Sequence, residues 1–184
     1  MKKFILFVFV SLIAASALSQ NQQYVGISLN PEFKDFNSLV LSYGVTYENQ
    51  LSKHSGFEID LIYRSSVNYF VYNAPASGIF NVNEKIRESF ISLPLLYKYY
   101  NDFVNISVGL SLNSFVGWKD LSENQNMQVT YNVNPKFFAG WIAKVSKPFA
   151  LSQKLVLEPE IYINPDIGYG HSYFGVSAKL KYKL

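Results

Sequence analysis

The sequence lacks cysteine and contains only two histidines, His54 and His171. A chain without cysteine forms no disulfide bond and cannot be a lipoprotein. Transition-metal sites are built mainly from cysteine and histidine, and two isolated histidines do not make one. The composition therefore predicts neither a disulfide framework nor a metal site, and we expect no cofactor.

Long hydrophobic runs are also missing after the first nineteen residues. No segment there approaches the ~20 consecutive apolar residues that a transmembrane helix requires. Charged residues make up only 16% of the chain and aromatic residues as much as 17%. The charged share is below that of ordinary soluble domains. A membrane protein of this composition has to be a closed β-barrel, because in lipid only helices and closed barrels satisfy every backbone hydrogen bond.

The first nineteen residues have the pattern of a secretory signal peptide. Lys2 and Lys3 make a basic start, an apolar run follows, and small residues precede Gln20. We expect cleavage after Ser19, with cleavage after Ala17 as the alternative. A permanent helical anchor is the other interpretation, and the apolar run is too short to favour it. The sequence thus predicts a signal peptide over residues 1–19 and one barrel domain over residues 20–184.

A strong net charge is absent from the predicted mature chain. The whole sequence has sixteen basic and thirteen acidic residues, and two of the basic ones are the lysines of the signal peptide. Fourteen basic residues then face thirteen acidic ones, so net charge gives no reason to expect a nucleic-acid partner.

What the sequence does contain is period-2 alternation, most clearly from Ser89 to Trp118. Apolar residues occupy every second position on both sides of a polar Asn101-Asp102 turn, which is typical of a β-hairpin. The strands are longer than the five or six residues usual in soluble proteins. Tyr97 and Tyr99 end one apolar row and Trp118 ends the other. Long apolar rows with aromatic ends are typical of a transmembrane β-barrel hairpin.

Eight segments show this alternation, and they predict an all-β, eight-stranded, antiparallel up-and-down transmembrane barrel. They are 22–29, 38–49, 56–67, two in the hairpin 89–118, 134–147, 154–163 and 171–184. The connections alternate between long and short, as expected when both termini lie in the periplasm of a Gram-negative bacterium. The long connections 68–85 and 119–132 would be external loops, and we expect any protein partner to bind there.

The last strand carries a second indication of the outer membrane. Its apolar row runs from Phe174 to the final residue, Leu184. A closing strand with an apolar and aromatic row resembles the terminal signal that barrel-assembly machinery reads, although that signal usually ends in phenylalanine. We therefore expect two partners: the assembly machinery during insertion and outer-membrane lipid afterwards.

The run from Glu88 to Tyr99, ESFISLPLLYKY, resembles the "IPLLLKY" strand of the PorT-like outer-membrane β-barrel family. Weaker similarities are Val108-Gly109-Leu110, Phe138-Ala139-Gly140 and Leu157-Glu158-Pro159-Glu160. The resemblance implies an eight-stranded barrel in a Gram-negative outer membrane. It implies little about activity, although some members of the family are linked to protein secretion. Fold by itself does not settle function.

Charged residues lie on the rows expected to face the barrel interior. Glu58, Asp60 and Arg64 should face Glu88 and Lys98, whereas Glu158 and Glu160 should lie between Lys144 on one side and Lys179 and Lys181 on the other. Paired carboxylates can act as a general acid and base or as a proton or ion site. An eight-stranded interior is only wide enough for side chains, however, and buried charges need partners. We therefore expect a charge-paired plug and no wide pore.

An enzyme is the less favoured interpretation. His171-Ser172 suggests a lipid-hydrolysing site, but adjacent strand residues point to opposite faces, and the outer rows offer no obvious acid. His54 lies in a short turn and is most simply solvated. We expect no catalytic, cofactor-binding or metal site, and a structural or partner-binding role.

Two alternatives and one structural expectation remain. The alternatives to a structural or partner-binding barrel are an accessory component of a secretion or transport assembly and a secreted lipocalin-like binder of a small apolar ligand. A lipocalin would turn its apolar rows inward. Pro94 has no N–H for a β-ladder, so we expect a local bulge or a missing bond there.

Overall fold

The computed structural model describes residues 22–36, 38–74, 79–121, 135–167 and 170–184. The predicted signal peptide and most of the predicted loop 119–132 lie outside these residues. No helix among the described residues is long and apolar enough to cross a membrane.

Nine strands make up the described fold; eight of them overlap the expected segments, and the two-residue β7 lies in the predicted turn 148–153. They are β1 (Gln22–Lys34), β2 (Ser38–Gln50), β3 (Ser55–Ala74), β4 (Ile79–Tyr99), β5 (Asn105–Asp120), β6 (Phe137–Ser146), β7 (Phe149–Ala150), β8 (Leu155–Ile167) and β9 (Ser172–Lys183).

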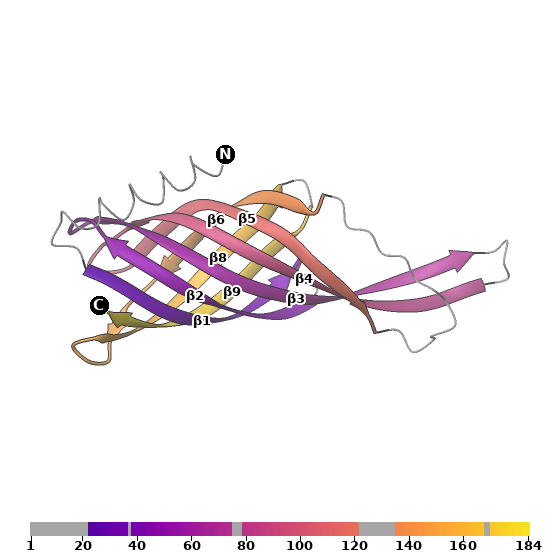
Figure 1. The fold of residues 1–184 in the computed structure, drawn as a ribbon, viewed down its shortest axis with the longest axis horizontal. Helices are drawn as coiled ribbons and strands as arrows, with labels where there is room; N and C mark the ends of the chain where they lie inside the picture. The colour runs from indigo at the N-terminus through magenta and orange to yellow at the C-terminus, as the bar shows by residue number, and fades with distance from the viewer. Residues whose placement is uncertain (1–21, 37, 75–78, 122–134, 168–169) are drawn as a thin grey trace.

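The strands form a single antiparallel sheet that closes on itself (Figure 1). Consecutive strands pair from β1 to β6, β9 pairs with both β1 and β8, and β6 pairs with β8 to complete the ring. The two-residue β7 pairs with β8 in the same register as β6, so β6 and β7 act as one wall strand that is interrupted at Lys147-Pro148. The predicted eight-stranded up-and-down barrel is confirmed.

The in-strand prolines explain where the ladders are broken. Between β3 and β4, pairing stops at Ile59–Leu95 and resumes in the same register at Ile62–Ser92, beside Pro94. The missing bond expected at Pro94 is therefore confirmed. The other ladder of β4, to β5, continues through Pro94 without a break. A proline lacks only one N–H, so a closed barrel tolerates it by losing pairs on one side of the strand.

A further break, at Pro165 of β8, is compensated by a side chain. The β6–β8 ladder has no pairs between Gly140–Asp166 and Ala143–Ile163. There the Asn164 side-chain amide donates to the backbone carbonyl of Trp141 at 3.0 Å. The amide supplies a donor next to a residue that has none, which keeps the carbonyl satisfied inside the wall.

The first predicted segment, 22–29, is too short, and the predicted polar connection 30–37 is wrong. β1 continues to Lys34, and Asp35 and Phe36 form the turn with φ angles of 51° and 60°. Pro31 and the polar residues around it suggest a loop. The β1–β2 ladder nevertheless runs unbroken from Gln22–Gln50 to Lys34–Ser38.

The longest predicted loop, 68–85, is wrong as well. β3 continues outward to Ala74 and β4 begins at Ile79, with one register shift near the tip. The β2–β3 ladder ends at Tyr43–Tyr63, and the β4–β5 ladder ends at Ile86–Asp120. Beyond those points the two strands pair only with each other in the described ladders and continue into a projecting arm. We call residues 64–74 and 79–85 the ribbon; the side chains at its base, Arg64 and Ser66, are still buried at the end of the lumen. Figure 1 shows it extending past the wall at the end opposite the C-terminus.

The two faces of the wall differ in chemistry. The outward rows are apolar and exposed; Ile27, for example, is 61% exposed and Leu110 is 59%. The inward rows bury charged and polar side chains, and Glu58 and Lys98 are both 0% exposed. A lipocalin would have the opposite arrangement, so the lipocalin-like alternative is wrong.

Aromatic side chains end the outward rows, as the sequence predicts. Tyr97 and Tyr99 are exposed near the β4–β5 turn, and Trp118 is exposed near the outer end of β5. An apolar band between aromatic residues matches the surface that a barrel presents to a bilayer.

Candidate functional site

The barrel interior holds two clusters of charged side chains, one at each end of the lumen. In the first cluster, the one nearer the termini, the Lys98 ammonium lies at the centre. Its Nζ is 2.8 Å from Glu48, 3.0 Å from Glu58 and 2.8 Å from Glu158. One oxygen from each of these carboxylates lies within 4.8 Å of the others. Three acids at that spacing form a cation site, and the ammonium of Lys98 already contacts all three.

Three further lysines complete this first cluster, which we call the inner cluster. Lys179 Nζ lies 2.6 Å from Glu58, 3.1 Å from Asp60 and 3.2 Å from Glu160. Lys144 pairs with the same three acids. Lys181 pairs with Glu48 at 2.7 Å and also with Glu158. Each ammonium is shared among acids from several strands, so the cluster ties opposite sides of the wall together.

The second cluster, nearer the ribbon, is built around Arg64. Its Nε donates to Glu32 at 2.9 Å and its Nη2 donates to Asn164 at 2.9 Å. The guanidinium carbon lies 4.4 Å from the centre of the Tyr173 ring, a cation–π distance. The Tyr162 hydroxyl donates to the second oxygen of Glu32 at 2.6 Å. The guanidinium and the carboxylate are thus each held by more than one partner.

An ion pair between Lys34 and Glu88 extends this second cluster, which we call the outer cluster, towards the ribbon. Lys34 Nζ lies 3.2 Å from Glu88 and donates to the Asn68 side chain at 3.1 Å. The Asn68 amide also donates to Glu88. This group joins the end of β1 to the point where β3 and β4 leave the wall.

Apolar side chains separate the two clusters. Leu96, Ile142 and Tyr162 form a buried hydrophobic cluster within the lumen. Along β4, Leu96 lies between Lys98 of the inner cluster and Ser92, which accepts from Arg64. Along β8, Tyr162 lies between Glu160 and Asn164. The described residues therefore offer no continuous row of charges through the barrel.

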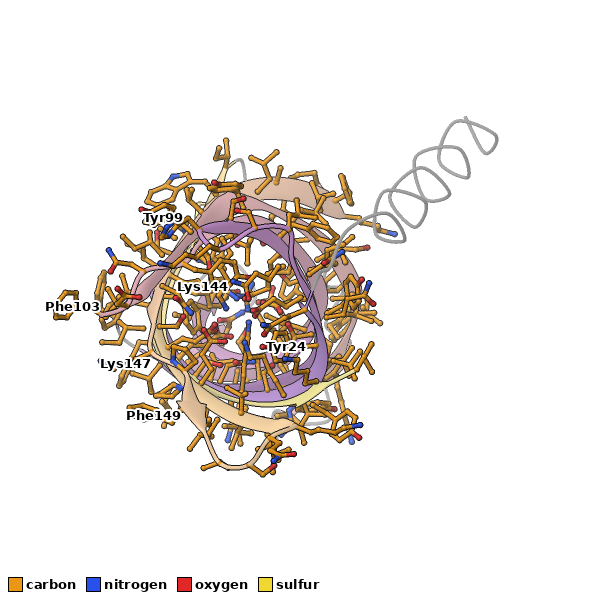
Figure 2. The ribbon with its side chains drawn as sticks, turned by 90° about the vertical axis from the view of Figure 1, so that its left-hand side faces the viewer. Tyr24, Tyr99, Phe103, Lys144, Lys147 and Phe149 are labelled. Carbon is orange, nitrogen blue, oxygen red and sulfur yellow. The ribbon has the colours of Figure 1, made fainter. Side chains whose placement is uncertain are left out.

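Aromatic residues cover the inner cluster at the end where the termini lie. The Tyr100 hydroxyl donates to Glu48 at 3.0 Å. Burial and the neighbouring Glu48 charge raise the pKa of Tyr100, so the phenol stays protonated and remains a donor. Lys181 Nζ lies 5.0 Å from the centre of the Tyr24 ring. Figure 2, viewed from this end, shows Tyr24 and Lys144 inside the ring and Tyr99, Phe103 and Phe149 outside it.

The charges in the lumen nearly balance. Among the described residues, eight buried carboxylates face six buried cations. The acids are Glu32, Glu48, Glu58, Asp60, Glu88, Glu158, Glu160 and Asp166, and the cations are Lys34, Arg64, Lys98, Lys144, Lys179 and Lys181. Buried charges are stable only when they are paired in this way. The arrangement forms a plug, as expected from the sequence.

The predicted partners are correct for Glu58, which meets Lys98, and wrong for Asp60, which meets Lys144 and Lys179, and for Arg64. Glu158 and Glu160 do lie among Lys144, Lys179 and Lys181. Arg64, in contrast, pairs with Glu32 and not with Glu88. The sequence analysis missed Glu32 and Lys34 because it placed them in a loop. Their alternation in phase with Ser28 and Asn30 was the available signal.

The two histidines lie at opposite ends of the barrel. His54 lies in the exposed β2–β3 turn, as predicted, with Nδ1 at 3.1 Å from the Tyr100 carbonyl. His171 Nδ1 lies 2.6 Å from the Asp35 carboxylate, an acid that the sequence analysis did not find. Ser172 meets the same carboxylate through its backbone N–H at 2.8 Å. In the described contacts, Ser172 thus interacts with the His171–Asp35 pair through its backbone N–H.

Comparison with known proteins shows which solved structures have a similar fold. No protein-family model matches the sequence, and no curated protein matches it. The structure is similar to that of Ail, the attachment invasion locus protein of Yersinia pestis, with a TM-score of 0.51 and 9% identity over 89% of this chain and 97% of that one. It is also similar to the outer membrane protein OprG of Pseudomonas aeruginosa, with a TM-score of 0.53 and 11% identity over 90% of this chain and 96% of that one. With its apolar exterior and charged interior, the protein has the fold of the eight-stranded outer-membrane β-barrels.

Proposed function

We propose that the protein is a closed barrel that presents the ribbon to a protein partner outside the cell. The observation that carries this proposal is the ribbon itself, in which β3 and β4 continue past the wall at the end opposite the C-terminus. In barrels of this class the termini face the periplasm, so the ribbon faces outward. Ail, which shares this fold, is described as an attachment protein. That role is of the kind proposed here.

The filled lumen supports a role other than that of a wide pore. Inserted into planar lipid bilayers, the protein should give no stable conductance steps of the size of an open porin. Among the described residues, the paired clusters and the apolar cluster between them occupy the lumen, so we expect no path for hydrated ions. The control is an open porin inserted in the same bilayers. Regular porin-sized steps from this protein would contradict the proposal.

The partner-binding role is tested by shortening the ribbon. Replacing residues 69–85 by Asn-Gly joins Asn68 and Ile86, a pair whose backbone groups point toward each other, through a two-residue hairpin turn. After crosslinking in intact outer membranes, we expect the partner to copurify with the native protein and to be lost from this variant.

The matched control shortens a turn at the other end. Replacing residues 52–54 by Asn-Gly joins Leu51 and Ser55, whose backbones already bond across that turn. This variant should retain the partner. If the ribbon variant retains the partner, the proposal is wrong.

A second candidate function is that of an accessory component of a secretion or transport assembly. Apolar side chains project from the turns at the periplasmic end: Phe103 is 78% exposed, and Phe149 and Leu151 are about half exposed (Figure 2). The similarity of Glu88–Tyr99 to the PorT-like family favours the same candidate, and we propose membership of that family on this run. A periplasmic contact would survive the ribbon variant and fail when Phe103 is replaced by Ser. Neither candidate involves catalysis.

A further inference from the structure

The outward part of β3 has an open edge, and the direction of its backbone groups can be deduced. The Leu121 N–H donates to the Lys85 carbonyl at 2.7 Å, so Lys85 points its backbone groups away from β3. Tyr69 lies directly opposite Lys85. In an antiparallel pair, opposite residues either exchange both bonds or both point away. The backbone groups of Tyr69 therefore point to the other side of β3.

The same parity holds along this part of β3, because the β3–β4 register is constant from Val71–Asn83 inward. Pro94 supports this assignment. The even-numbered residues of β4 should bond to β3, and the β3–β4 ladder is broken beside Pro94, an even-numbered residue without an N–H. Residues that point away from β4 are the odd-numbered ones. From Tyr63 inward they meet β2. Beyond Tyr63, in the described residues, no ladder pairs Ser65, Val67, Tyr69 or Val71 on that side.

The open edge is not protected in the ways that edges usually are. Natural edge strands carry lysine, other charges, proline or bulges that prevent another strand from adding to them. None of the nineteen residues 65–83 is Asp, Glu, Lys or Arg. The proline in this range, Pro75, lies beyond the end of β3, and the register shift lies beyond Tyr72. The edge from Ser65 to Val71 is regular and uncharged.

We propose that this edge of β3, from Ser65 to Val71, binds an extended segment of a protein partner by β-strand addition. The inference rests on the proposed partner-binding function and names the partner class and the mode of contact. Four residues offer alternating N–H and C=O groups at the spacing of a β-ladder, and an extended polypeptide repeats the complementary groups at that spacing. The incoming strand would become the third strand of the ribbon and would be about seven residues long.

A second copy of the chain fits this edge less well than a different protein does. Two barrels in one membrane have the same orientation, so their β3 strands would run in the same direction. Pairing them edge to edge would give a parallel ladder, which is slightly less stable per residue than an antiparallel one. The outer edge of β4 is shorter, because Lys85 already bonds to Leu121. An antiparallel strand from another protein has no such restriction.

The first test is amide hydrogen exchange, measured by NMR on the full-length barrel in detergent micelles. Without a partner, the amides of Ser65, Val67 and Tyr69 should exchange rapidly, and those of Ser66 and Asn68, which bond to β4, slowly. Equal protection of the two sets would mean that the edge is already covered and would overturn the proposal.

The second test uses a fluorescent synthetic peptide with the sequence of residues 79–86, which already pairs with β3 from the other side. Val71 and Asn83 lie directly opposite each other, and their N–H groups point to opposite edges of the ribbon. V71P removes a donor from the open β3 edge, and N83P removes one from the β4 edge. Neither removes a β3–β4 bond, so each is the matched control for the other.

We expect the peptide to protect the odd-numbered amides and V71P to weaken its binding about tenfold, the equivalent of one lost hydrogen bond and its disturbed neighbours. N83P should change the affinity less than about twofold. No binding, or equal effects of both prolines, would overturn the edge assignment. So would a concentration-dependent dimer that V71P abolishes, because a second copy would then be the occupant. The proposed function would survive these results if shortening the ribbon still removes the copurifying partner.

Discussion

Replacing Lys98 by methionine should destabilise the folded barrel by about 3–5 kcal/mol, the usual effect of removing one partner from a buried ion pair. The methionine replaces the aliphatic part of the side chain and removes the ammonium that contacts Glu48, Glu58 and Glu158. Three carboxylates within 4.8 Å would then repel one another in a site with no access to water. The measurement is the free energy of unfolding in phospholipid vesicles, obtained from a denaturant titration.

Two further variants show whether the effect comes from the lost charge. Lys53→Met makes the same change in the exposed β2–β3 turn and should alter stability by less than about 0.5 kcal/mol. Adding Glu48→Gln to Lys98→Met removes one of the repelling acids and should restore part of the loss. The one amide oxygen at position 48 can still accept from Lys181 or from Tyr100, which bond to different oxygens of Glu48 in the native protein. Equal stability of Lys98→Met and the native protein would show that the lumen tolerates unpaired acids and is not a plug held by charge.

Replacing Leu110 by arginine should cost about 2–4 kcal/mol, as expected for a cation at the middle of the lipid-facing surface. Leu110 is 59% exposed on β5 and pairs with Leu95 and Trp141, near the middle of the wall. Lipid does not solvate a guanidinium, and the side chain has no nearby acid on the outer face to pair with. The free energy of unfolding in vesicles again measures the effect.

The control for depth is Tyr97→Arg. Tyr97 is 53% exposed on the same outer face but lies next to the β4–β5 turn. An arginine there reaches the headgroups and should cost about 0–1 kcal/mol. Small effects at both positions would mean that the exterior contacts water, and that the apolar rows are not a lipid surface.

These two predictions concern opposite faces of the same strands, and together they describe how the barrel is stable. Its lumen is held by shared ion pairs, and its exterior is held by lipid. Neither face resembles the core of a soluble domain, where apolar side chains pack inside. The apolar cluster of Leu96, Ile142 and Tyr162 is an exception, and it lies between the two charged clusters.

The sequence alone determined which side chains face the lumen and which face lipid. Side chains alternate strictly along a strand, so parity assigns a face as soon as a strand is identified. Glu58, Asp60 and Lys98 were placed inside from parity, and all three are buried. The broken ladder at Pro94 also follows from the residue, because a proline has no N–H in any fold.

Only the tertiary structure decided which charges meet. Arg64 reaches Glu32 on β1, although β2 lies between the two strands, and Lys144 on β6 reaches Glu58 on β3. Such contacts depend on the stagger between strands around the ring and on where the ring closes. Asp35 meets His171 for the same reason, because closure places β1 beside β9. Neither the stagger between strands nor the position of ring closure is encoded in the alternation of a single strand.

The ribbon could not be predicted from the sequence for a related reason. The polar residues of 68–85, with a proline and a glycine among them, have the composition of a loop, and they break the apolar-polar alternation by which strands are recognised. That alternation marks only strands with one face in lipid. A ribbon that projects past the wall has no lipid face, so its pairing is set by backbone bonds between β3 and β4, which become visible only when the two strands lie side by side.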